Sequence, residues 1–211
     1  YSWSGTSTIL KPIRLISGFL TVGFWTLASR ILGMVREILL FSLIGAGPLL
    51  DAFFAAFRLP NMFRRFFAEG AFNSAFVPLI SKKYERKENA TAFANEAMGS
   101  LAFILLILTT FAIIFMPAVI WAIANGFVGD ERFEITVAFG RVMFPYILLI
   151  SLAALLSGVL NALGYFAAAA AAPILLNITI IFGLCISFFF EWPIMTILIY
   201  SVPFAGILQL I

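Results

Sequence analysis

The chain has 211 residues, of which 63% are hydrophobic, 11% are charged and 25 are Phe. Soluble domains carry about 25% charged residues, and a globule of this length cannot bury so much apolar surface. These values exclude an ordinary soluble domain, a disordered chain and a disulfide-rich secreted domain, and they indicate an integral membrane protein. The 13 Lys and Arg against 10 Asp and Glu give no basic surface for nucleic acid.

Six apolar segments follow one another along the chain. A membrane-spanning helix needs about 20 mostly apolar residues, and no segments of alternating hydrophobicity recur. The long uncharged stretch over 142–190 is divided by Asn161, Gly164 and Pro173. We therefore predict an all-α, polytopic membrane helix bundle. Its helices cover residues 17–45, 49–81, 92–124, 133–161, 168–190 and 194–211.

The charges between these segments predict the orientation of the bundle. Lys11 and Arg14 precede the first segment, and residues 82–87 form a basic loop after the second. Residues 130–134 are net acidic, and Glu191 follows the fifth segment. Because cytoplasmic loops carry an excess of Lys and Arg, we expect the N-terminus and the 82–91 loop to be cytoplasmic. Residues 125–134 and 191–193 should then lie outside, which agrees with an even alternation of six spans.

The two ends of the chain differ from the rest. Residues 1–16 are polar at their start, so we interpret them as an N-terminal extension or an expression remnant. The last helix stops at Ile211 without a flanking charge. We expect the chain to be the front part of a longer protein.

Charged residues recur where the first two segments should cross the lipid. A charge at the bilayer centre costs at least about 2.5–3.5 kcal/mol, so such residues normally face a cavity, a partner or a substrate. Pro60 and Gly70 also predict a kinked or locally unwound second helix. The charged residues are Arg30, Arg36, Glu37, Asp51, Arg58, Arg64, Arg65 and Glu69.

Two interpretations apply to different members of this set of charged residues. Internal ion pairs that fix helix packing are favoured for Glu37, Asp51, Arg58 and Glu69. A cavity that binds an anion is favoured for Arg30, Arg36, Arg64 and Arg65. Five Arg against three acids leave positive charge over, and the guanidinium fork matches phosphate oxygens. The sequence contains no phosphate-binding loop, nucleophile motif or metal-ligand cluster, so we expect neither an enzyme nor a cofactor.

Several of these charges lie in motifs that resemble a known family. Residues 29–37 (SRILGMVRE), 51–72, 75–78 and 144–152 are similar to the MurJ (MviN) family of lipid II flippases, and residues 161–164 and 172–177 continue the match. The resemblance covers about residues 17–211. It implies an exporter fold with two six-helix lobes around a central cavity. Residues 17–211 would then form the N-terminal transmembrane lobe, without the second lobe.

The resemblance also implies a function and a site. Family members move lipid II, a polyprenyl-pyrophosphate-linked glycopeptide, from the cytoplasmic to the periplasmic leaflet of the bacterial inner membrane. The family's cavity arginines fall on Arg30, Arg36 and Arg64, and Ser29 lies beside them. Other family-motif positions, with less defined roles, fall on Glu37, Asp51, Arg65 and Glu69.

We therefore expect a transporter that works by alternating access in peptidoglycan biosynthesis. Its expected partners are lipid II, membrane lipids and a possible coupling ion, and no nucleic acid. Alternatives are an exporter of another anionic lipid-linked glycan, a drug or cation exporter, or a membrane protein of cell-wall assembly that does not transport. An enzyme acting on polyprenyl pyrophosphates is disfavoured, since Asp51 and Glu69 lack the clustered-carboxylate spacing of a magnesium site. We expect this chain to be unable to transport alone.

Overall fold

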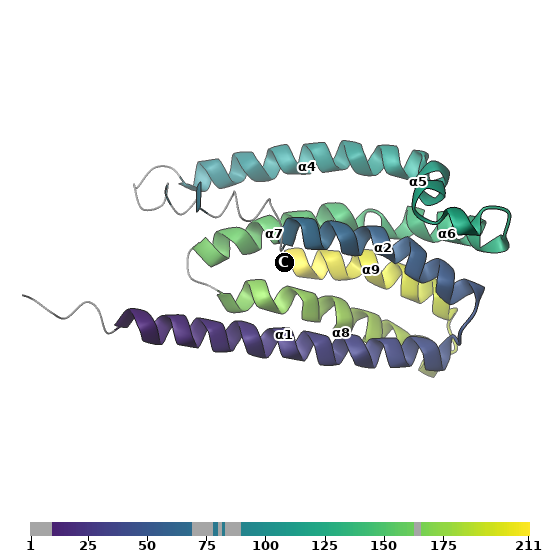
Figure 1. Cartoon of the computed structure of the whole chain (residues 1–211), viewed down its shortest axis with the longest axis horizontal. Coiled ribbons are helices and arrows are strands. Elements are labelled where there is room, and N and C mark those ends of the chain that lie inside the picture. Colours follow the sequence, from purple (N-terminus) through teal and green to yellow (C-terminus); the bar gives the residue numbers. More distant parts are fainter. Residues whose placement is uncertain (1–9, 69–77, 80–81, 83–89, 163–165) are drawn as a thin grey trace, which may run out of the picture.

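The computed structural model describes residues 10–68, 78–79, 82, 90–162 and 166–211. All regular structure in these ranges is helical, as predicted (Figure 1). The elements are α1 (Leu10–Leu43), α2 (Pro48–Ala68), α4 (Ala90–Ile114), α5 (Met116–Ile123), the 3-10 turn η1 (Asn125–Phe127), α6 (Glu131–Met143), α7 (Tyr146–Ala162), α8 (Phe166–Phe190) and α9 (Ile194–Leu210).

Each of the six predicted segments contains helix, and among the described residues the segments 92–124 and 133–161 are not continuous. The segment 92–124 divides into α4 and α5 at Phe115, just before Pro117. The segment 133–161 divides into α6 and α7, which are bent by 41° where Pro145 follows Phe144. Proline lacks a backbone N–H and its ring crowds the preceding turn, which explains both breaks.

The N-terminal helices also differ from the prediction. α1 begins at Leu10, so residues 10–16, expected to belong to an extension, are helical. α2 continues through Pro60, so of the two predicted alternatives, a kink or local unwinding, the unwinding is wrong there. The prediction for Gly70 lies outside the described residues.

The helices alternate in direction along the long axis of the bundle. In Figure 1, α1 and α4 start at one end, whereas α6 and α9 start at the opposite end. The basic N-terminal segment therefore lies at the end opposite the acidic residues that begin α6. This is the even alternation that the loop charges predicted.

Length and hydropathy single out part of the bundle as membrane-spanning. Within the described ranges, Thr91–Ile114 and Pro173–Phe190 each suffice to cross a bilayer, and Glu131–Met143 with Tyr146–Leu160 would make a third, broken span.

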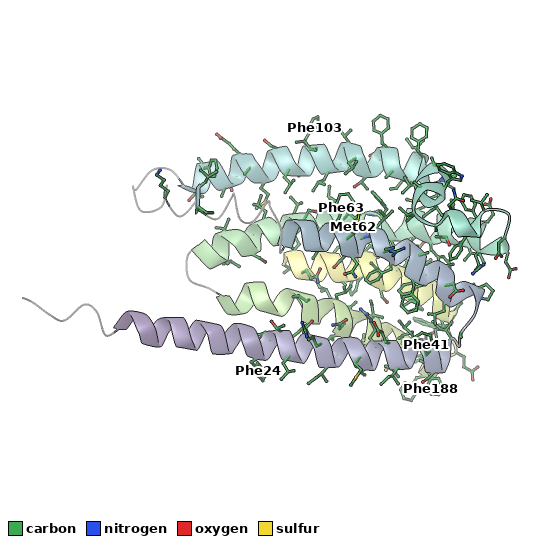
Figure 2. All side chains as sticks on the ribbon, in the orientation of Figure 1. Phe24, Phe41, Met62, Phe63, Phe103 and Phe188 are labelled. Carbon is green, nitrogen blue, oxygen red and sulfur yellow. The ribbon has the colours of Figure 1, made fainter. Side chains whose placement is uncertain are left out.

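Large apolar side chains cover the outside of the bundle. Phe24 on α1, Phe103 on α4 and Phe188 on α8 point outward (Figure 2), and each is more than 60% exposed. Water would make such a surface aggregate, whereas lipid tails solvate it. The chain is accordingly a membrane protein.

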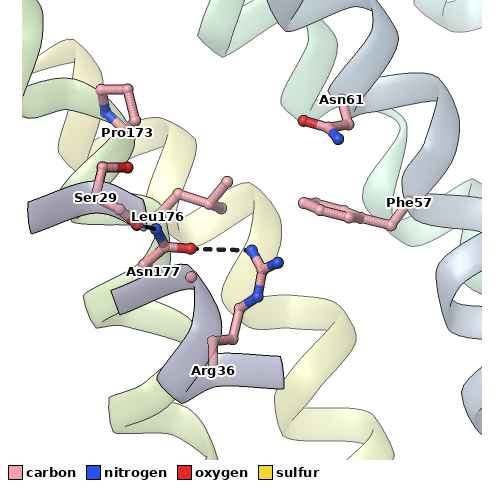
Figure 3. A pocket seen from close by; sticks show the side chains of 8 residues that line it. Ser29, Arg36, Phe57, Asn61, Pro173, Leu176 and Asn177 are labelled. Carbon is pink, nitrogen blue, oxygen red and sulfur yellow. Dashed lines mark hydrogen bonds between the residues drawn. The ribbon is translucent and has the colours of Figure 1, made fainter. Parts of the chain in front are cut away.

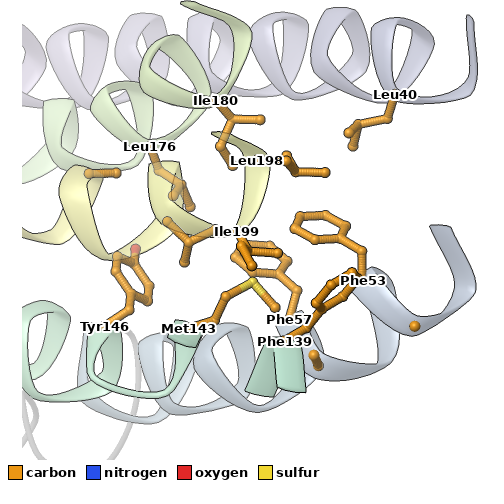
Figure 4. Packing of buried hydrophobic residues seen from close by; sticks show 14 of the residues in the cluster. Leu40, Phe53, Phe57, Phe139, Met143, Tyr146, Leu176, Ile180, Leu198 and Ile199 are labelled. Carbon is orange, nitrogen blue, oxygen red and sulfur yellow. The ribbon is translucent and has the colours of Figure 1, made fainter. Parts of the chain in front are cut away.

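The interior is a packed apolar core. Phe53 and Phe57 of α2 stack with their ring centroids 5.6 Å apart, and they lie among Met143, Leu198 and Leu40 (Figure 4). α2 packs mainly on α6 and α7, whereas α1 packs along α8, which in turn packs on α9. The core therefore places α2 opposite the α1–α8 pair.

Candidate functional site

A small polar pocket lies between α2 and the α1–α8 pair (Figure 3). Its volume is about 170 Å³, and since a liquid water molecule occupies about 30 Å³, it has room for a small polar group. Its lining residues are Ser29, Gly33, Arg36, Phe57, Asn61, Pro173, Leu176 and Asn177.

Helical periodicity explains why these residues meet. Ser29, Gly33 and Arg36 are four and three residues apart, so they lie on one face of α1. Phe57 and Asn61 are four residues apart on α2 and share a face in the same way. The two faces meet across the pocket, and α8 completes its wall.

Arg36 is the cation of the pocket. Its Nη1 donates a 2.9 Å hydrogen bond to Oδ1 of Asn177, and its Nη2 lies 3.3 Å from Oε1 of Glu37. Its Cζ lies 5.9 Å from the ring centroid of Phe57. The Arg36 side chain is 15% exposed, whereas that of Glu37 is 57% exposed. The guanidinium is thus held inside the bundle while its acidic neighbour reaches outward.

Asn177 joins the two helices behind Arg36. Its Nδ2 donates a 3.0 Å hydrogen bond to the main-chain oxygen of Ser29, while its Oδ1 accepts from Arg36. Gly33 lies beside this amide, and a Cβ added there would be 3.7 Å from Nδ2. A small residue on α1 therefore faces the amide that links α1 to α8.

The chemistry of the lining favours an anion. Arg36 is the cation among the lining residues, none of these residues is acidic, and Asn61 supplies a further amide. A guanidinium in an apolar bundle attracts an anion more strongly than it would in water, because the local dielectric constant is low. The pocket can bind a phosphate-like group.

The structure separates the predicted site residues. Ser29 and Arg36 line the pocket, and Glu37 contacts Arg36 from the side. Arg30 and Arg58 are exposed and are not among the lining residues.

Three predicted site residues lie outside what the structure describes. The backbone at Arg64 and Arg65 belongs to α2, but their side chains are outside the described part, as is Glu69. A cavity lined by several arginines therefore stays a prediction.

Asp51 lies in an ionic cluster at another place in the bundle. Its Oδ2 is 3.3 Å from Nη1 of Arg132, whose Nη2 is 2.6 Å from Oδ2 of Asp130. Asp130 also caps the N-terminus of α6, and the Arg132 guanidinium holds the pKa of the Asp130 carboxyl below its usual value. The Arg132 guanidinium lies 4.5 Å from the ring centroid of Phe127. The cluster ties the start of α2 to the start of α6.

The sequence analysis did not assign Phe57, Asn61 and Asn177 to the site. The signal that could have found the two Asn residues is a side-chain amide within an apolar helix, since such a group needs a hydrogen-bond partner inside the bundle.

Helices with an apolar outer surface around a small cationic pocket define a polytopic membrane protein. A family model described as lipid II flippase MurJ matches residues 40–211, and the chain belongs to this family. The resemblance found in the sequence is thereby confirmed.

Individual relatives agree with the family model. A probable lipid II flippase MurJ of Rhizobium tropici is 47% identical over 205 residues, with 94% of this chain and 38% of the relative covered. The lipid II flippase MurJ of Burkholderia cenocepacia is 39% identical over 204 residues, with 93% of this chain and 39% of the relative covered. The chain thus spans about two fifths of the length of these relatives.

A solved structure supports the same conclusion for the fold. A lipid II flippase MurJ in an inward closed conformation superposes with a TM-score of 0.76 at 29% identity, covering 90% of this chain and 40% of the other. The predicted fold class, an all-α membrane bundle of this exporter type, is confirmed.

Proposed function

We propose that this chain forms one wall of the cavity in which a flippase binds lipid II and carries it from the cytoplasmic to the periplasmic leaflet of the bacterial inner membrane. The observation that carries the proposal is the guanidinium of Arg36, held 15% exposed in a polar pocket among apolar helices. Family membership supplies the cargo, because the relatives are named for lipid II.

The cargo poses a desolvation problem that such a pocket addresses. The pyrophosphate of lipid II cannot enter hydrocarbon unaided, because burying an unpaired charge is very costly. Arg36 offers a planar set of donors that pairs with phosphate oxygens and stays charged at all relevant pH values. The polyprenyl tail would remain in the lipid outside the bundle.

The other arginines extend this site in the proposal. Arg64 and Arg65 continue α2 beyond Asn61, and Arg30 follows Ser29 on α1. We assign Arg30, Arg64 and Arg65 to the pyrophosphate as it enters or leaves the pocket. Asp51 and Arg58 have structural or gating roles in this scheme, as do Glu37 and Glu69.

Transport would follow from rocking of two lobes about the site, with the N-terminus of this chain in the cytoplasm. Each positive charge that moves across the membrane gains or loses about 2.3 kcal/mol per 100 mV, so the membrane potential or a coupling ion could reset the empty cavity. The protein acts as a transporter in this scheme and forms no covalent intermediate.

Native mass spectrometry of the purified chain with lipid II tests the proposal. We expect lipid II adducts that a neutral diacylglycerol does not form, and that Arg36→Ala weakens at least about tenfold, since a hydrogen bond to a charged group contributes about 1.5–3 kcal/mol. Arg141→Ala is the matched control, because Arg141 is exposed on α6. Equal adducts in wild type and Arg36→Ala, or no adducts in well-folded wild type, would contradict the proposal.

A further inference from the structure

The side chain of Asn177 makes two hydrogen bonds at the pocket, one to each of two residues of α1. It donates from Nδ2 to the main-chain oxygen of Ser29 at 3.0 Å and accepts at Oδ1 from Arg36 at 2.9 Å. Asn177 is 6% exposed, and the two partners lie 148 and 141 residues away in the sequence. The amide therefore links α8 to α1, and the same side chain also holds the guanidinium of Arg36 in one direction.

The chemistry of the partners explains why an amide stands at this position. The Ser29 carbonyl can only accept a hydrogen bond and the Arg36 guanidinium can only donate, so the residue between them needs one donor and one acceptor. Asn supplies both without a charge. A carboxylate would accept from Arg36 but would give the carbonyl nothing, and its negative charge would compete with an anionic cargo.

Arg36 has a second acceptor within reach. Oε1 of Glu37 lies 3.3 Å from Nη2, which is long for a charge-assisted hydrogen bond, whose usual length is about 2.7–2.9 Å. The Glu37 side chain is 57% exposed, so a guanidinium that turned fully toward it would leave the pocket. The shorter bond to Asn177 opposes that movement. Figure 3 shows the guanidinium and Asn177 together, with Phe57 and Asn61 on the facing helix.

We propose that Asn177 is a positioning residue for cargo binding: it keeps the Arg36 guanidinium in the pocket and prevents its collapse onto Glu37. This inference rests on the proposed function, because it concerns the same anion site. It adds the requirement that the residue at 177 be a neutral donor and acceptor. Asn177 acts through Arg36 and need not touch the cargo.

Two variants of the purified chain test the inference, with lipid II affinity measured by native mass spectrometry. Asn177→Leu removes both hydrogen bonds while it keeps the branching at Cγ, and we expect about tenfold weaker binding because Arg36 turns to Glu37. Asn177→Leu combined with Glu37→Gln should regain most of the lost affinity. Asn177→Asp, which is nearly the same shape, should also bind at least about tenfold more weakly, since its carboxylate pairs with Arg36.

A matched control separates positioning from packing. Thr179 is also buried on α8, and its Oγ1 bonds only within the helix, to the main-chain oxygen of Leu175 at 2.7 Å. Thr179→Val should therefore leave lipid II affinity unchanged, whatever it does to the melting temperature. A purely structural role for Asn177 would lower the melting temperature without changing the affinity of the folded chain.

The outcomes separate this inference from the proposed function. Absence of lipid II binding by folded wild type overturns the proposed function. If wild type binds and Arg36→Ala does not, the proposed function stands. The positioning role is then overturned if folded Asn177→Leu or folded Asn177→Asp binds lipid II with wild-type affinity. It is also overturned if Asn177→Leu loses lipid II affinity and the added Glu37→Gln substitution does not restore it. If Asn177→Leu does not fold, Asn177→Asp decides alone.

Discussion

Replacement of Arg36 by Lys separates charge from geometry at the pocket. Both residues are cationic, but Arg presents donors in a planar fork, whereas Lys presents a compact ammonium. In the structure Nη1 of Arg36 holds Asn177 while Nη2 points to Glu37, and the guanidinium lies near the Phe57 ring. A lysine ammonium cannot satisfy Asn177 and also pair with two phosphate oxygens in one plane.

The expected loss follows from these contacts. One charge-assisted hydrogen bond contributes about 1.5–3 kcal/mol, and 1.4 kcal/mol corresponds to tenfold in affinity. The 5.9 Å distance to Phe57 is at the outer limit for a cation–π contact, so its contribution is small and is omitted. Arg36→Lys should therefore weaken pyrophosphate binding by about 10–100-fold.

Titration calorimetry of the purified chain with a short-chain polyprenyl pyrophosphate measures this loss. Arg141→Lys serves as the control, because Arg141 is exposed on α6 and its replacement should leave the affinity unchanged. If Arg36→Lys binds within about twofold of wild type, a point charge is enough. The explanation based on paired donors would then be wrong.

Two further predictions concern stability. Arg132 lowers the pKa of Asp130 in the folded state, so Asp130 stabilises the fold above the ordinary carboxyl pKa of about 3.9 and loses this effect as the pH falls through its lowered value. Asp130→Asn should flatten the fall in melting temperature as the pH is lowered below about 4, and an unchanged slope there would exclude this role. At Gly206 an added Cβ would come 2.8 Å from Cδ2 of Tyr146 and 2.9 Å from Cβ of Leu149. Gly206→Ala should destabilise the fold by about 1–3 kcal/mol in thermal unfolding, and an unchanged melting temperature would contradict such tight packing.

Hydropathy could predict the helices because lipid contact demands apolar side chains over a fixed length. It could not predict where the helices break. Pro60 and Pro173 lie inside continuous helices, whereas Pro145 stands at the 41° bend and Pro117 at the start of α5. Whether neighbouring helices compensate for the lost hydrogen bond decides between these outcomes, and that depends on tertiary packing.

The candidate site could also be predicted only in part from the sequence. The seven-residue spacing of Ser29 and Arg36 placed both on one face of a helix, and the structure has both in the pocket lining. Asn177 contacts them from 148 and 141 residues away, and Arg132 contacts Asp51 from 81 residues away. Periodicity relates residues within one helix, so it contains no information on such contacts between distant helices.

A cryo-electron microscopy structure of the chain with a bound polyprenyl pyrophosphate would test the central claim most directly. We predict pyrophosphate density in the pocket between α2 and the α1–α8 pair, within hydrogen-bond distance of Arg36, with Asn177 still bonded to the same guanidinium. Density for the pyrophosphate at another site, with this pocket closed or filled by side chains, would contradict the assignment of the anion site to this pocket.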